Sequence, residues 1–134
     1  DSAVSRGLGD VYKRQSTNST PTIKDSAGTE FGRFCKCFCN YNMQTNTINA
    51  SFGVSSVTDN GTGVCTINFS TAFASATSYS AAVLGNGDVG NGAHHYPSTY
   101  FGGIAAGSFK IGFFRNENSG DRTDQARSFF SFFE

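Results

Sequence analysis

The sequence has no tryptophan, one methionine and two prolines, and its charged residues are few. Ten basic residues balance ten acidic ones, so the formal net charge is zero. A neutral chain does not favour binding to the phosphates of a nucleic acid. No stretch approaches the roughly twenty apolar residues of a membrane helix, and the N-terminus lacks the apolar segment of a secretory signal. We therefore expect neither nucleic-acid binding nor membrane insertion.

The residues that are abundant favour β-structure. The chain of 134 residues contains 14 phenylalanines and 16 glycines, with many serines, threonines and asparagines. Aromatic residues fit pleated, half-buried strands, and glycine and asparagine fit the turns between them. No segment has the 3.6-residue periodicity of an amphipathic helix. The length and composition predict a single all-β domain, an antiparallel β-sandwich or jelly-roll-like fold of about seven or eight strands.

The four cysteines are predicted to be core residues. Cys35, Cys37 and Cys39 alternate, so that in a strand they share one face with Tyr41. Neighbours two apart in one strand have parallel side chains, which is poor geometry for a disulfide. The paired spacing of a zinc site is missing. A disulfide from Cys65 to one of the three remains the alternative.

The stretch from Ser51 to Phe69 is predicted to be the hairpin that organises the fold. Its upstream strand has small and polar residues between apolar ones that we expect to be buried: Ile48, Ala50, Phe52 and Val54. The change of apolar phase after Val54 predicts a β-bulge near Ser55-Ser56. Asp59-Asn60-Gly61 predicts a type I′ turn, because Asn and Gly tolerate positive φ.

Other alternating segments predict further strands. These cover residues 34–43, 79–83, 109–113 and 126–133, with Phe73 closing the core in the irregular link 70–77. The last strand has aromatic residues in both phases, so we expect it to be buried on both faces or to contact another subunit. Residues 85–107 have little periodicity and are predicted to be a functional loop, with short strand character near Tyr100 and Ile104.

The first 33 residues differ from the rest. Residues 1–15 carry SRGLGDVYKRQ, which looks like translated adapter sequence at the end of a metagenomic reading frame, and we expect a non-native or disordered leader. Residues 16–33 are polar and turn-rich, and we expect a connector with a possible short strand at residues 22–24. Residues 34–134 are predicted to form the β-sandwich.

A resemblance to a known family rests on several strings in order. NASFGVSSVTDNGTGVCTINFSTAFASATSYSAAVLG resembles the C-terminal domain of phage tail fibre proteins from marine and metagenomic phages. IKDSAGTEFGRFCKCFCNYN and the closing FFRNENSGDRTDQARSFFSFF resemble the flanking segments of that domain, so the resemblance covers about residues 21–134. Four positions depart from the family pattern, each in a way that fits a repacked core: Cys37, Phe38, Cys65 and Ala74.

The resemblance implies an adhesive function. A distal tail fibre module would bind a bacterial surface polysaccharide or an outer-membrane protein, follow an upstream fibre shaft and assemble as a homotrimer. Its place would be the virion, after synthesis in the cytoplasm of the host bacterium. Weak contacts at each tip would be multiplied by several tips acting together. The alternatives are a virion decoration or baseplate domain without a receptor, and part of a carbohydrate-active enzyme.

The candidate receptor-binding residues come from two polar, irregular segments, 85–107 and 116–124. Aromatic and imidazole side chains suit stacking on sugar rings, and amide, carboxylate and guanidinium groups suit hydrogen bonds to hydroxyls. The candidates are Asp88, His94, His95, Tyr96, Tyr100, Asn118 and Arg122. Adjacent histidines can bind one metal ion only from a loop, and we expect no metal or other cofactor. We expect no catalysis, because the carboxylates available for an acid pair all fall in polar loops.

Overall fold

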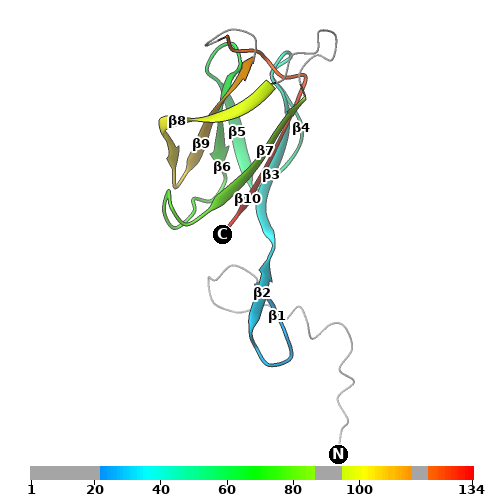
Figure 1. The fold of residues 1–134 in the computed structure, drawn as a ribbon, viewed down its shortest axis with the longest axis vertical. Coiled ribbons are helices and arrows are strands. Elements are labelled where there is room, and N and C mark those ends of the chain that lie inside the picture. The colour runs from blue at the N-terminus through cyan, green and yellow to red at the C-terminus, as the bar shows by residue number, and fades with distance from the viewer. Residues whose placement is uncertain (1–21, 87–94, 116–120) are drawn as a thin grey trace, which may run out of the picture. The chain divides into compact units, whose positions relative to one another are not determined.

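A computed structural model describes residues 22–86, 95–115 and 121–134 (Figure 1). The chain divides into two compact units, Asp1–Phe34 and Cys35–Glu134. In the first unit, β1 (Thr22–Lys24) pairs antiparallel with β2 (Glu30–Arg33). The turn between them is fixed by the Asp25 carboxylate, which accepts hydrogen bonds from the backbone amides of Ala27 and Thr29 at 2.9 and 2.8 Å.

The second unit is an all-β sandwich, as the composition predicted. One sheet has the order β4 (Thr47–Phe52), β3 (Cys35–Asn42), β10 (Arg127–Phe133), β7 (Ser80–Asn86). The other has the order β5 (Val54–Asp59), β6 (Val64–Phe69), β9 (Ser108–Arg115), β8 (His95–Ala105). All pairings within these two four-stranded sheets are antiparallel (Figure 1). Within the described ranges no helix is long and apolar enough to cross a membrane.

Inward-facing residues of both sheets form one core. Each of the four inner strands contributes alternate residues, and Phe73 from the link closes one end as predicted. The buried apolar residues are Cys37, Cys39, Tyr41, Met43, Val64, Cys65, Ile67, Phe69, Phe73, Phe109, Ile111, Phe113, Phe130 and Phe132. Four rings from different segments surround the Phe132 ring, mostly edge to face: Phe69, Phe73, Tyr79 and Phe109.

The predicted core role is confirmed for three of the four cysteines. Cys37, Cys39 and Cys65 are buried, and Cys35 is partly exposed with its thiol donating to the Cys37 carbonyl at 3.0 Å. All four cysteines are free. Burial raises the pKa of the Cys37 and Cys65 thiols to about 12, and that of Cys39 to about 11. These three groups are therefore neutral thiols at physiological pH and poor nucleophiles.

The upstream half of the predicted hairpin is wrong. The residues from Ile48 to Val54 are not one strand, because β4 and β5 belong to opposite sheets and the chain crosses at Gly53, whose φ is 69°. A Cβ atom on Gly53 would lie 2.6 Å from the Cys37 Cβ, so glycine is required there. β4 is exposed along its whole length, and Phe52 faces outward. The register shift opposite Asn40 and Tyr41 also pairs Ile48 with the buried Tyr41, whereas Phe52 is paired with the exposed Phe38, so the predicted common buried face is wrong.

The downstream hairpin, β5 with β6, is confirmed, as is its bulge between Val54 and Ser56. The type I′ turn is wrong. The connection is a four-residue loop in which Gly61 and Gly63, rather than Asn60, take positive φ. The amide of Asn60 donates to the Val64 carbonyl, and the amide of Val64 donates to the Gly61 carbonyl, both at 2.9 Å. Two glycines two residues apart allow this wider loop.

The prediction of a loop over residues 85–107 needs correction. Residues 95–105 of the predicted loop form the long strand β8, whose register with β9 shifts between Thr99 and Ile104; residues 87–94 lie outside the described ranges. A strand interrupted in this way has no continuous alternation for a sequence pattern to detect. The last strand, β10, is buried on one face only, since Phe129 and Phe133 remain 40% and 36% exposed. Of the two alternatives predicted for it, burial on both faces is therefore wrong, and contact with another subunit stays a prediction.

Candidate functional site

Three side chains form a row on the outer face of the sheet β5-β6-β9-β8. Tyr96 of β8 is paired with Phe114 of β9, and Phe114 is bridged on its other side by Arg122. The rings of Tyr96 and Phe114 stack with centroids 6.5 Å apart and an interplanar angle of 21°. The Arg122 guanidinium carbon lies 5.8 Å from the Phe114 ring centroid. We call these three residues the aromatic–cation row.

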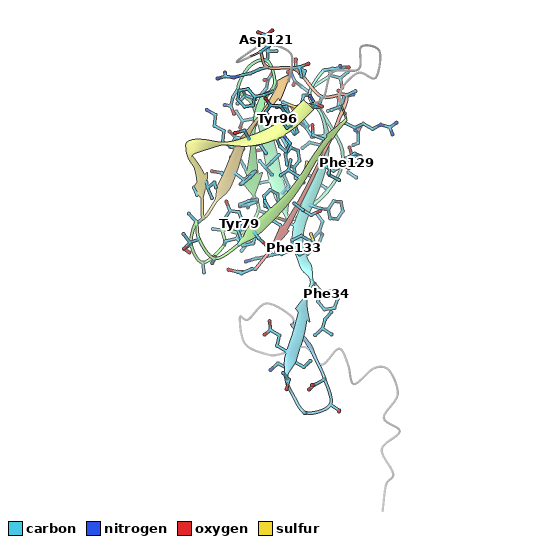
Figure 2. All side chains as sticks on the ribbon, in the orientation of Figure 1. Phe34, Tyr79, Tyr96, Asp121, Phe129 and Phe133 are labelled. Carbon is cyan, nitrogen blue, oxygen red and sulfur yellow. The ribbon has the colours of Figure 1, made fainter. Side chains whose placement is uncertain are left out.

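The row is accessible to a ligand. Tyr96 is 48% exposed, Arg122 is exposed and Phe114 is half-buried between them. Figure 2 shows Tyr96 and Asp121, the neighbour of Arg122, toward the same end of the sandwich. The inward neighbour Phe113 is completely buried, which fixes the phase of β9 and turns Phe114 outward.

Backbone hydrogen bonds hold Arg122 in the row. The amide of Thr123 donates to the Phe113 carbonyl at 3.2 Å, and the amide of Met43 donates to the Gln125 carbonyl at 3.0 Å. The Asp124 carboxylate accepts from the Gly63 amide at 2.6 Å. A Cβ atom on Gly63 would lie 2.5 Å from the Thr123 nitrogen, so the close approach depends on glycine. The β5–β6 loop therefore positions the segment that carries Arg122.

Polar side chains continue the outer face away from the row. The Asn68 amide donates to the hydroxyls of Ser56 and Thr58 at 3.1 and 3.0 Å. The Thr66 hydroxyl donates to the Asn60 side-chain oxygen at 2.6 Å. This surface presents hydroxyl and amide groups in fixed positions, the groups with which proteins bind sugar hydroxyls.

A separate apolar cavity of about 400 Å³ opens between strands of the two sheets. Its lining is Ala76, Tyr79, Ala81, Val83, Pro97, Ile104, Phe109 and Ile111. The one hydroxyl among these residues, that of Tyr79, already donates to the carbonyls of Ala105 and Ser108 at 3.1 and 3.3 Å. Burial raises the pKa of Tyr79. The cavity thus lacks the polar groups that a sugar would need, and it is not the candidate site.

The seven residues predicted from sequence are only partly placed. Tyr96 and Arg122 are 26 positions apart in the sequence, and both lie in the aromatic–cation row, next to Phe114. His95 and Tyr100 belong to β8 by their backbone. Asp88, His94 and Asn118 lie outside the described residues. Phe114 was missed, although the buried phase Phe109, Ile111, Phe113 already indicated that the adjacent aromatic residue faces outward.

Three of the described carboxylates in the sandwich, Asp59, Asp124 and Glu134, have structural partners. Asp59 accepts from the Gly61 amide at 2.8 Å and from the Asn46 side chain at 3.0 Å, and Asp124 holds Gly63. Glu134 pairs with Lys36 at 2.6 Å and accepts from the Ala74 amide at 3.1 Å. These hydrogen bonds, the one from Lys36 foremost, lower the pKa of Glu134 to about 2. Among described residues no group of three or more potential ligands could hold a metal ion.

Comparisons with known proteins identify no family. No protein-family model matches the sequence, and no curated protein matches it. A solved structure, the phiAB6 tailspike in complex with three-repeated oligosaccharides of Acinetobacter baumannii surface polysaccharide, aligns with a TM-score of 0.42 and 18% identity. The alignment covers 96% of this chain and 31% of that one, so the chain spans about a third of the tailspike's length. At that TM-score and identity, the likeness assigns neither fold nor function to this chain.

Proposed function

We propose that this chain is the distal adhesive module of a phage tail fibre and that it binds a glycan on the bacterial surface. The observation that carries the proposal is the exposed aromatic–cation row of Tyr96, Phe114 and Arg122. The resemblance of SSVTDNGTG and its flanking strings to tail fibre domains supports the phage class. An all-β sandwich supplies the rigid support that such a binding surface needs.

The row suits a sugar for chemical reasons. The flat faces of Tyr96 and Phe114 offer apolar area against the C–H face of a pyranose, and the Tyr96 hydroxyl can exchange hydrogen bonds with the sugar. The Arg122 guanidinium offers several donors in a fixed plane, which match hydroxyls or the carboxylate of an acidic sugar. The hydroxyl and amide groups of Ser56, Thr58 and Asn68 extend the polar part of the same face.

The remaining parts of the proposal concern assembly and location. We propose a virion protein, made in the cytoplasm of the host bacterium and joined to an upstream shaft. A homotrimer would present several rows together, so that weak single contacts give firm attachment. An outer-membrane protein is the alternative receptor, and its recognition would use the same exposed row.

We further propose that the module is not an enzyme. The support is the structural use of Asp59, Asp124 and Glu134, whose carboxylates hold backbone or side-chain groups of the sandwich. A glycosidase would need two free carboxyl groups facing one substrate. Incubation with a polysaccharide that the chain binds should release no reducing ends, and release would contradict this part of the proposal.

Binding of the full chain to purified bacterial capsular and O-antigen polysaccharides, measured by biolayer interferometry, tests the proposal. Tyr96→Ala and Arg122→Ala should each weaken binding roughly tenfold, since one stacking or charged contact contributes about 1–1.5 kcal/mol. Ser51→Ala, on the exposed edge strand β4 of the other sheet, is the control and should change binding little. Equal binding by all variants would contradict the site, and docking onto virion proteins without any polysaccharide binding would favour a decoration domain.

A further inference from the structure

The two sheets of the sandwich differ in their outer faces. The outer face of the sheet β5-β6-β9-β8 carries the hydroxyl and amide side chains described above. The outer face of the sheet β4-β3-β10-β7 instead exposes five large apolar side chains. These form the outer apolar face: Phe38, Phe52, Leu84, Phe129 and Phe133. Each is between 36% and 69% exposed. Figure 2 labels Phe129 and Phe133, which lie on the same strand, β10.

The strand register makes this face continuous. Phe38 is paired with Phe52, and the two rings stack with centroids 6.4 Å apart. In the neighbouring row Phe129 is paired with Leu84. Phe38 and Phe129 lie on adjacent strands, two positions apart in register. The face therefore crosses all four strands rather than consisting of isolated exposed residues.

The exposed area is large for a small domain. Five side chains of 150–250 Å², each about half exposed, leave roughly 400–600 Å² of apolar surface. That is near the upper limit for the largest patch on a typical monomer. It is also more than half of the roughly 800 Å² that each partner buries in a stable interface, and the polar residues between the rings would supply the rest.

The charges of the face are confined to its ends. Lys36 is paired with Glu134 at 2.6 Å, and Arg127 lies at the opposite end of β10. Protein–protein interfaces typically have few charged residues at their centre and polar or charged residues at their rim, as this face does.

The size pattern of the face fits a copy of itself. In one row the large pair Phe52 and Phe38 continues into the small residues Ser131 and Ala82. In the next row the order is reversed: Ala50 and Asn40 precede Phe129 and Leu84. Large apolar residues thus alternate with smaller or polar ones across the face. The large side chains of one copy can therefore lie against the small residues of a neighbouring copy.

We propose that a second copy of this chain covers the outer apolar face, with Phe52 and Leu84 as its main contacts. The inference rests on the geometry of this sheet and does not depend on glycan binding. The aromatic–cation row lies on the other sheet, so each copy keeps its row accessible when the outer apolar face is covered.

Sedimentation velocity of the full chain over a range of micromolar concentrations tests the proposal. The wild type should associate, and Phe52→Ser with Leu84→Ser should weaken association at least tenfold. Tyr96→Ser is the matched control: it removes an exposed aromatic ring from the other sheet and should leave association unchanged. Far-UV circular dichroism and thermal unfolding check that each variant folds. If the double variant does not fold, the single change Phe52→Ser on the edge strand β4 carries the same expectation.

Three results would overturn the proposal. The first is a wild type that stays monomeric at every concentration. The second is association that persists unchanged in the folded Phe52→Ser and Leu84→Ser variants. The third is a monomer that binds neutral phosphatidylcholine vesicles through this face, which would identify a lipid surface as the partner. Loss of polysaccharide binding in Tyr96→Ser with association intact would separate this contact from the glycan site.

Discussion

Phe132 is the residue on which the largest aromatic contacts of the core converge. It is completely buried, and its ring lies 4.8 Å from that of Phe69 and 5.3 Å from that of Phe109, centroid to centroid. Phe132→Ala should lower the free energy of unfolding by about 3–5 kcal/mol, through lost burial and the cavity that remains. Chemical denaturation measures this change.

Phe129 is the matched control for that substitution, because it lies on the same strand and faces outward. It is 40% exposed. In the monomer Phe129→Ala should cost less than about 1 kcal/mol. Equal losses for the two variants would contradict the assignment of inner and outer faces on β10.

Glu134 makes stability depend on pH. Its pKa is lowered to about 2 by hydrogen bonds from Lys36, Ala74 and Ser78, so the folded state favours the carboxylate more than the unfolded state does. This stabilisation is complete above the ordinary pKa of the group and is lost as the pH falls toward 2. Its size, discounted for the partial exposure of the pair, is about 1–2 kcal/mol.

Glu134→Gln is the variant that tests this linkage. It should be less stable than the wild type at neutral pH, and the difference should shrink as the pH falls from about 5 to 2. Urea denaturation at several pH values measures it. A difference that stays constant over this range would show that the carboxylate charge is not responsible.

At the scale of elements, the β5–β6 loop connects the fold to the candidate site. Gly63 has φ of 68° and no room for a Cβ atom beside Thr123, whereas Gly61 has φ of 99° and open space around it. Gly61→Ala should lower the free energy of unfolding only by the strain of placing a Cβ atom on a left-handed backbone, about 1–2 kcal/mol. Gly63→Ala should lower the free energy of unfolding by roughly 2–4 kcal/mol, because the new Cβ atom would also collide with Thr123. The collision should displace the segment that carries Arg122. Unfolding free energy and polysaccharide binding measure the two effects; equal behaviour of the variants would contradict the positioning role of Gly63.

The elements differ in how far sequence could predict them. Strands with a covered inner face, such as Cys35–Asn42 and Ser108–Arg115, follow their alternation closely. Thr47–Phe52 alternates equally well in sequence, but it lies at an exposed edge and its pairing with β3 shifts register, so the pattern predicted neither its burial nor its face. Gly53 was not expected to pass the chain between sheets, because that requirement comes from its approach to Cys37 in three dimensions.

At the scale of the whole sandwich, the candidate site depends on pairing between strands. Tyr96 and Arg122 were predicted as separate candidates, and nothing in their spacing indicated that Phe114 would join them. The difference between the polar and the apolar outer faces was likewise not predictable, because it depends on which strands become neighbours. Register, rather than composition, determines which side chains form a surface.

The two outer faces give the domain a division of roles in our proposal. The polar sheet, with the aromatic–cation row of Tyr96, Phe114 and Arg122, would face the bacterial surface. The apolar sheet would be covered by another copy. Association would then raise the number of rows per particle without using any residue of the row, and the effective affinity for a repeating polysaccharide would rise with that number.

Staining of whole bacteria tests the central claim most directly. The fluorescently labelled full chain should attach to cells of a susceptible strain, and removal of the surface polysaccharide should abolish attachment. The Tyr96→Ala, Arg122→Ala double variant should fold and associate as the wild type does but attach at background level. Attachment of the double variant at the wild-type level, or attachment that survives removal of the polysaccharide, would contradict the claim that the aromatic–cation row binds a surface glycan.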